Sequence, residues 1–208
     1  MAKQIRKIRR PRKKRNIKNL QTLLASLVAE TTGETVSVED LLNAVGRRAF
    51  GPLLLLLGFI AISPLTIVPG TSWLVALVTL LIAGQVLLGQ TRPWLPKKAL
   101  AVSFPREALI KGVEVMAKPA RIVDSFLKPR IGLLTEAPFV QLVSLLAMGA
   151  ALITFPLGLI PFGPILPGLA VMLIGLGLTA RDGIMLLLSG GAMVGAVVFV
   201  INVADKIS

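Results

Sequence analysis

Two groups of proline and glycine residues interrupt the two longest apolar stretches of the chain. Each group is followed by apolar sequence that can form a helix, so each break places a helix start among apolar residues. A helix N-terminus offers unpaired N–H groups and about half a positive charge, which together favour an anion. The sequence therefore predicts anion-binding chemistry at the paired breaks. The candidate residues there are Pro64, Pro69, Gly70, Ser72, Pro156, Pro161, Gly163, Pro164, Pro167 and Gly168.

Four arginines at the edges of the apolar stretches form a second set of candidates. A guanidinium group can hold a phosphate or a carboxylate through two parallel hydrogen bonds. The competing interpretation is that the arginines only mark the cytoplasmic boundary, and that Pro and Gly only shape tight turns. That interpretation is favoured for single arginines, whereas a function is favoured for the paired breaks, because unpaired backbone in lipid is costly. The four arginines are Arg47, Arg48, Arg92 and Arg181.

The first apolar stretch, residues 53–88, contains no charged residue. Its first part, residues 53–62, would rise only about 15 Å as a helix, half of a bilayer core. Thr71 or Ser72 is placed to cap a second helix that starts at Trp73. Irregular backbone at membrane depth persists only where protein or a wet cavity surrounds it. The stretch therefore predicts a broken helical hairpin that either spans the bilayer or re-enters it.

The second apolar stretch, residues 139–180, repeats this design. Its break carries two prolines at the same spacing as the first break, and a helix is expected from Leu169. Interrupted apolar segments at matching places in two halves are typical of transporter repeats, so we predict an internal repeat. Residues 184–203 form one uninterrupted terminal span, on which Gly191 and Gly195 offer a face for helix packing and homodimer formation.

Basic residues gather on both sides of the first hairpin. Ten of the 23 Lys and Arg residues lie in residues 1–18, and residues 91–137 carry nine basic against four acidic residues. This bias favours the cytoplasmic side and contact with anionic lipid headgroups. The predicted organisation is a basic disordered arm (1–18), a first half (19–90), a basic interfacial connection (91–137) and a second half (138–208).

Segments outside the hairpins show amphipathic helical periodicity. Apolar residues recur at helical spacing over residues 20–28, and Ser37 with Asp40 has the spacing of a capping box that starts another helix. A third amphipathic segment is expected to open at Ser103 and to stop at Pro119. We expect these segments to lie at the membrane interface.

The composition excludes several function classes. The net charge of +13 is concentrated where no aromatic residues interleave the basic ones, so we predict no nucleic-acid partner. The chain has no Cys, His or Tyr and no carboxylate pair within the apolar stretches, so we predict no enzyme, no catalytic residue, no metal and no cofactor. Gln85 is polar within the first stretch, and a hydrogen bond to the other hairpin is favoured over one to a solute.

Several motifs together resemble one family. They are VSVEDLLNAVGRRAFGPLLLLLG at residues 36–58, SPLTIVPGTS at the first break, GQTRPWLP at residues 89–96, PLGLIPFGPILPG at the second break and the Ala180-Arg-Asp-Gly closure. The chain resembles the exopolysaccharide synthesis ExoD family of bacterial membrane proteins over nearly everything after the basic arm. This resemblance implies an inner-membrane protein linked to exopolysaccharide production and tolerance of alkaline conditions. It implies no particular reaction or substrate.

The predicted fold is therefore an all-α polytopic integral membrane protein with two Pro/Gly-broken hairpins, amphipathic interfacial helices and one terminal transmembrane helix. We expect a multi-pass inner-membrane protein with a cytoplasmic N-terminus. The leading functional hypothesis is binding or transport of a small anionic or lipid-linked solute at the paired hairpin tips. The alternative is a non-transporting accessory or scaffold protein of polysaccharide assembly. A wet pathway at the breaks would favour the first, and a dry, packed tip the second.

Overall fold

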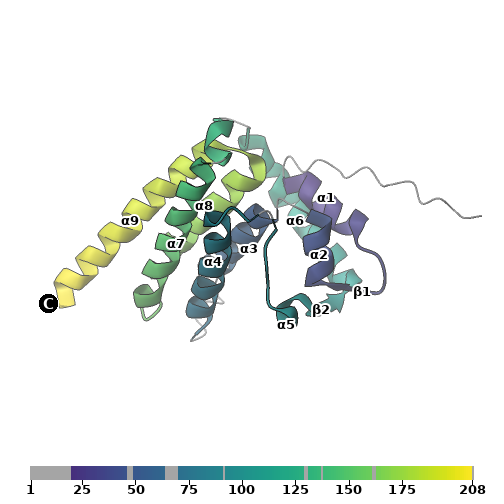
Figure 1. The fold of residues 1–208 in the computed structure, drawn as a ribbon, viewed down its shortest axis with the longest axis horizontal. Coiled ribbons are helices and arrows are strands. Elements are labelled where there is room, and N and C mark those ends of the chain that lie inside the picture. Colours follow the sequence, from purple (N-terminus) through teal and green to yellow (C-terminus); the bar gives the residue numbers. More distant parts are fainter. Residues whose placement is uncertain are drawn as a thin grey trace, which may run out of the picture.

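The computed structural model describes residues 20–45, 49–63, 70–90, 92–128, 131–136, 138–160 and 163–207. In these ranges the regular elements are helices apart from one short pair of strands. Figure 1 shows two neighbouring groups of elements. Long apolar helices lie side by side in a bundle, and shorter amphipathic helices lie beside it together with the strands. The predicted basic arm lies outside the described residues.

The bundle contains five helices of the described chain. The first apolar stretch supplies α3 (Phe50–Ile62) and α4 (Thr71–Leu87), the second supplies α7 (Phe139–Leu157) and α8 (Ile165–Ala180), and α9 (Gly183–Ile207) follows. In each stretch one helix ends near its proline-rich break and another begins after it, as predicted. α3 packs against α8, α4 packs against α7, and α9 lies along α8. The core between them contains the fully buried side chains of Leu54, Ile82, Ala147, Ala150 and Ile174.

The helix boundaries at the second break differ from the prediction. α8 begins at Ile165 rather than at Leu169, so Pro167 and Gly168 lie in its first turn. Proline is tolerated there because the first N–H groups of a helix have no intrahelical partner. On the other side of the same break, α7 includes Pro156 and ends one residue later, at Leu157.

The start of α4 is also different from the prediction. Gly70 is the residue before the helix. It has a left-handed backbone (φ 87°), and as a glycine it offers no side chain to cap the helix. Thr71 and Ser72 are the first two helical residues. The prediction that one of these hydroxyls caps the helix is therefore wrong, because the left-handed glycine begins the helix earlier than an extended Ser or Thr would.

Among the residues that the structure describes, two helices are long and apolar enough to cross a membrane, judged by length and composition. They are Phe139–Leu157 and Gly183–Asn202. Only 17% of the second segment is buried inside the structure, whereas a core helix of a soluble protein is mostly buried. Its outward side presents Leu187, Val194 and Val198, all at least half exposed. α3, α4 and α8 are apolar but shorter.

The second group of elements combines segments that are far apart in the sequence. Its members are α1 (Leu20–Glu30), β1 (Thr35–Ser37), α2 (Val38–Val45), α5 (Lys97–Leu100), β2 (Ser103–Pro105) and α6 (Arg106–Phe126), and η3 (Gly132–Thr135) leads back to the bundle. The strands pair antiparallel, with Val36 opposite Phe104. α1 packs on α6, and the Asp124 carboxylate accepts the N–H groups of Leu20 and Gln21 at 2.9 Å, which caps α1.

The predicted capping box at α2 is confirmed. The Ser37 N–H and hydroxyl donate to the Asp40 carboxylate at 3.0 and 2.7 Å, and the Asp40 N–H donates to the Ser37 hydroxyl at 3.1 Å. The hydrogen bonds from Ser37 favour the ionised carboxylate, so they lower the pKa of Asp40 below the ordinary aspartate value. This box fixes where α2 begins, directly after β1.

The predicted stop at Pro119 is wrong. α6 is one continuous helix of 21 residues with Pro119 inside it, and Ser103 lies in a strand instead of opening the helix. Pro119 is exposed, and Val115, whose carbonyl loses its usual N–H partner, is 66% exposed. The proline can therefore stay in the helix because the unpaired carbonyl lies on an open side.

Candidate functional site

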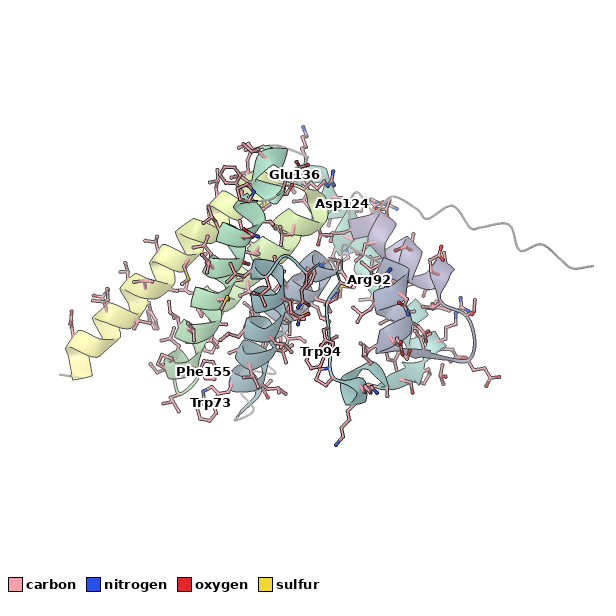
Figure 2. The ribbon with its side chains drawn as sticks, in the orientation of Figure 1. Trp73, Arg92, Trp94, Asp124, Glu136 and Phe155 are labelled. Atoms are coloured by element: carbon pink, nitrogen blue, oxygen red, sulfur yellow. The ribbon has the colours of Figure 1, made fainter. Side chains whose placement is uncertain are left out.

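The described helix ends that flank the two breaks lie at the same end of the bundle. The Trp73 indole N–H, at the start of α4, donates to the carbonyl oxygen of Phe155, near the end of α7, at 3.0 Å. Figure 2 shows these two residues next to each other at the lower end of the bundle. Gly168, in the first turn of α8, lies against Ala61 near the end of α3. We call residues 61–63, 70–73, 155–160 and 163–168 together the tip region.

Most predicted residues of the tip region are buried in close contacts. Ser72, Gly163, Pro164, Pro167 and Gly168 are buried, whereas Gly70 and Pro156 are exposed. A Cβ at Gly168 would approach that of Ala61 to 2.8 Å, and one at Gly158 would approach the Trp73 indole nitrogen to 2.8 Å. Both values are shorter than van der Waals contact. The described part of the tip region is therefore closely packed around its glycines.

The structure does not bring the described arginines to the tip region. Arg181 follows the last residue of α8, and Arg92 follows the end of α4. Both helices begin in the tip region, and their 17 and 16 residues place the opposite helix ends, which Arg92 and Arg181 follow, about 24 Å away from it. Arg92 and Arg181 are both exposed. An anion in the tip region would therefore lack these guanidinium groups. Arg47, Arg48, Pro64, Pro69 and Pro161 lie outside the described residues.

The closest helix packing in the bundle was not predicted. Gly51 and Gly58 on α3 are seven residues apart, as are Gly168 and Gly175 on α8, and each meets the opposite helix. In order along α3, the contacts are Gly51 with Thr179, Leu55 with Gly175, Gly58 with Met172 and Ala61 with Gly168. The residue numbers rise along α3 as they fall along α8, so the helices are antiparallel. We call these four contacts the glycine seam.

The glycine seam leaves no room between its two backbones. A Cβ at Gly175 would overlap the backbone of Leu55, and one at Gly58 would overlap the backbone of Met172. At the far end, a Cβ at Gly51 would lie 2.8 Å from the Thr179 hydroxyl oxygen. Small residues at helix interfaces allow this close approach in membrane proteins. The sequence signal that could have revealed the seam is the seven-residue glycine spacing in both stretches.

Five of the buried hydroxyl groups in the bundle donate within their own helices. Each donates to a carbonyl oxygen three or four residues earlier, at 2.6 to 2.8 Å. Such bonds satisfy a hydroxyl donor without a partner on another helix or a ligand. The residues are Thr79, Ser144, Thr154, Thr179 and Ser189.

Two polar side chains instead fix the connections between the bundle and the amphipathic elements. Gln85 donates to the carbonyl oxygens of Leu81 and Trp94 at 3.1 and 3.0 Å and accepts the N–H of Trp94, so these bonds join α4 to the segment after it rather than to the other hairpin. Asp182, 1% exposed, accepts the N–H of Ile184 at the start of α9 and the N–H of Lys128 after α6, each at 3.0 Å. An Asp directly before a helix is a recognisable cap signal, but its second bond depends on the tertiary fold.

Comparison with known proteins assigns the family. The model of the family described as "Exopolysaccharide synthesis, ExoD" matches residues 20–202. The chain belongs to the ExoD family. It is similar to the "Protein ExoD" of Rhizobium meliloti (strain 1021), with 32% identity over 164 residues. The aligned region covers 78% of this chain and 68% of that protein. No solved structure matches the chain.

Family membership confirms the resemblance predicted from the sequence motifs. The ExoD family is linked to exopolysaccharide synthesis, and this link applies to the chain through its membership. Within the described residues no group of three His, Cys, Asp or Glu side chains could hold a metal ion. The family name identifies no reaction, so the mechanism has to be proposed from the bundle itself.

Proposed function

We propose that this ExoD-family chain is a membrane-embedded, non-transporting accessory protein of exopolysaccharide synthesis. It acts through contacts of its outer surface and passes no solute through its own bundle. The observation that carries this proposal is the glycine seam, which holds α3 and α8 in backbone contact from Gly51 to Ala61. The core residues beside the seam are apolar and fully buried, and the buried hydroxyls of Thr79, Thr154 and Thr179 donate within their own helices. The described interior of the bundle therefore offers no polar lining for an aqueous path.

The membrane placement is part of the proposal. Leucine and valine side chains cover the outer sides of α4, α7 and α9, where a soluble protein would expose charge. The charge-free sequences of α3, α4, α7 and α8 agree with this placement. We place the chain in the inner membrane as a multi-pass protein with a cytoplasmic N-terminus, because its basic segments precede and follow the first hairpin.

We further propose that the two hairpins are a parallel repeat. The first helix of each hairpin packs on the second helix of the other, which is the exchange that a two-fold axis would produce. Both breaks lie at one end of the bundle, so this axis would run along the helices rather than across them. Inverted repeats would place the breaks at opposite ends.

The outer side of α9 is the contact surface that the accessory function would use, and homodimerisation through it is the simplest case. A Cβ at Gly190, Gly191 or Gly195 would meet nothing within 4 Å. Asn202 lies seven residues after Gly195 on the same side of the helix, where its amide nitrogen donates to the carbonyl oxygen of Val198 at 2.8 Å and its amide oxygen can accept from a partner helix. Small residues and an amide on one helix face favour close helix association in membranes.

Anion binding at the tip region is the second candidate function. It is favoured by one specific observation: α4 and α8 both begin there, and neither residue that precedes them provides a side-chain cap. Two helix N-termini at one end of the bundle would attract a phosphate or a carboxylate. The buried glycines and the distance to Arg92 and Arg181 weaken this candidate.

Exopolysaccharide output separates the two functions. Variants of the chain would replace the native copy in cells lacking it, and secreted polysaccharide would be measured at equal protein levels. Gly191→Ile changes the open side of α9, and Ser72→Ala removes a buried hydroxyl from the tip region. We expect the first variant to lose output and the second to keep it. Loss through Ser72→Ala with normal output from Gly191→Ile would support anion binding instead.

A further inference from the structure

Arg181 has a backbone conformation that suits glycine better than arginine. It follows the last residue of α8 and has a left-handed backbone (φ 58°, ψ 39°). Residues with a side chain are disfavoured in this conformation, because the Cβ atom crowds the neighbouring backbone. Among the described residues, Ile131 is the only other non-glycine residue with a positive φ. Such strain persists where the surrounding structure imposes it, and it gathers at ligand-binding sites.

The end of α4 provides a comparison within the same molecule. α4 and α8 are the second helices of the two hairpins, and both run from the tip region to the opposite end of the bundle (Figure 1). Both end in the same turn, in which an N–H donates to the carbonyl oxygen five residues earlier, at 3.0 Å after α4 and 2.9 Å after α8. The left-handed residue of this Schellman turn is usually glycine. It is Gly89 (φ 70°) after α4, but Arg181 after α8.

The buried carboxylate of Asp182 fixes the chain directly after Arg181. It accepts the N–H of Ile184 in the first turn of α9 and the N–H of Lys128 after α6, each at 3.0 Å. Asp182 therefore places Lys128 beside Arg181, and both of these cationic residues are exposed. Neither side chain forms an ion pair or a hydrogen bond with another described residue. Two cationic side chains thus lie at one fixed point of the bundle without an acidic partner in the described chain.

The position of the arginine distinguishes this site from a general basic boundary. A cytoplasmic boundary needs positive charge, which any exposed residue of the connection can supply. It does not need the charge at the one residue whose backbone favours glycine. A guanidinium held at a fixed turn is preorganised to bind two oxygens of a phosphate group, and a neighbouring lysine adds a second positive charge.

We propose that Arg181 and Lys128 bind one phosphate group at the end of the bundle opposite the tip region. Asp182 is the positioning residue, because it holds both backbones in place. The phosphate group belongs to a lipid of the adjoining leaflet or to a soluble phosphate compound, since both present the same oxygens. The site is separate from the outer side of α9 and does not depend on the bundle being non-transporting. Only the lipid source rests on the membrane placement proposed above.

Exchanging the two left-handed residues tests the proposal at constant net charge. The full chain in detergent micelles would be titrated with inorganic phosphate and, separately, with short-chain phosphatidylglycerol. Dissociation constants would be taken from the rise in melting temperature with ligand concentration. Arg181→Gly relieves the backbone and removes the guanidinium group. The matched variant combines it with Gly89→Arg, which moves the arginine to the same turn of the other hairpin, where the nearest atom to the new Cβ lies 4.0 Å away.

We expect phosphatidylglycerol to raise the melting temperature of the native chain. An equal rise with inorganic phosphate would assign a soluble phosphate compound, and a rise with the lipid alone a headgroup; either result supports the site. Without ligand, Arg181→Gly should melt at the native temperature or above it, because glycine suits the left-handed turn.

The dissociation constant of Arg181→Gly should nevertheless rise about tenfold or more, and the exchanged variant should show the same loss. Native affinity in either variant would overturn the proposal, since charge alone would then be sufficient. A native chain that responds to neither phosphate would overturn it as well. So would a clear fall in the melting temperature of Arg181→Gly without ligand, because the arginine would then stabilise the fold itself.

Discussion

Glycines at helical spacing occur in two opposite environments in this molecule. In the glycine seam, Gly58 and Gly175 each lie against the backbone of the facing helix. On α9, Gly191 and Gly195 are spaced as a helix-packing motif, yet a Cβ at either would meet nothing within 4 Å. Glycine therefore allows two helices of the chain to pack closely in the seam, whereas on α9 it leaves one side of the helix open. The first closes the bundle, and the second is available to another molecule.

The largest effect should come from filling the glycine seam. Gly175→Ala places a methyl group onto the Leu55 backbone, so α3 and α8 must separate. We expect the free energy of unfolding to fall by about 3 kcal/mol or more, the upper range of overpacking in a core. Denaturant unfolding of the purified protein in detergent micelles measures this. Gly84→Ala is the matched control, because nothing lies within 4 Å of its Cβ position, so stability should stay the same or rise by up to about 1 kcal/mol through helix propensity. Equal stability of the two variants would show that the seam is not closed.

An intermediate effect should come from filling the open side of α9. Gly191→Ile adds a branched side chain where the structure has space, so the fold should persist while helix association weakens. We expect the dissociation constant of the proposed homodimer to rise about tenfold, equivalent to about 1.4 kcal/mol. Energy transfer between labelled copies at increasing lipid dilution measures this. The comparison between the two glycine environments would fail if this variant unfolded like Gly175→Ala.

A small effect is expected when a hydroxyl is removed from the closed interior. Thr154 donates only to the carbonyl oxygen of Ala150 in its own helix, at 2.8 Å. Thr154→Val preserves the shape of the side chain, so we expect the free energy of unfolding to change by less than about 1.5 kcal/mol. Exopolysaccharide output should stay at the wild-type level. A large loss of output without loss of stability would mean that this hydroxyl faces a solute.

The smallest effect concerns the amphipathic elements alone. Hydrogen bonds from Ser37 lower the pKa of Asp40, so the ionised carboxylate stabilises the start of α2. Because the folded pKa is the lower one, this stabilisation is present above the ordinary aspartate pKa. It is lost as the pH falls through the folded value. Carbon-detected NMR titration of the Asp40 carboxyl should show the depressed pKa, and Ser37→Ala should return it towards the ordinary value. An unshifted titration in the unmodified chain would contradict the capping box.

The sequence predicted the elements of the fold better than their contacts. Charge-free stretches and proline breaks located both hairpins, and Ser37 with Asp40 located the start of α2, because those signals are local. Pro119 was misjudged because tolerance of a helical proline depends on which side of α6 is open. The pairing of β1 with β2 joins segments of three residues each, too short to show a periodicity.

At the candidate site, too, the sequence predicted the local features but not the contacts between them. The breaks were found, but the sequence could not show that they share one end of the bundle, since that depends on how the two hairpins pair. The distance of Arg181 from Gly168 follows only from α8 being one helix. The seven-residue spacing of Gly51 and Gly58, and of Gly168 and Gly175, was visible in the sequence. Its meaning required knowing that α3 faces α8 rather than lipid.

The central claim, that the bundle is closed to water, is tested most directly by cysteine accessibility. Ser72→Cys and Thr154→Cys place thiols at buried positions near the tips, and Leu159→Cys places one at a tip position that is 73% exposed. A membrane-impermeant maleimide would be applied to oriented vesicles from each face. We predict labelling at residue 159 only, with the thiols at residues 72 and 154 reacting after denaturation. Labelling at residue 72 or 154 in intact vesicles, reduced by added phosphate, would contradict a closed bundle and establish a wet path at the tips.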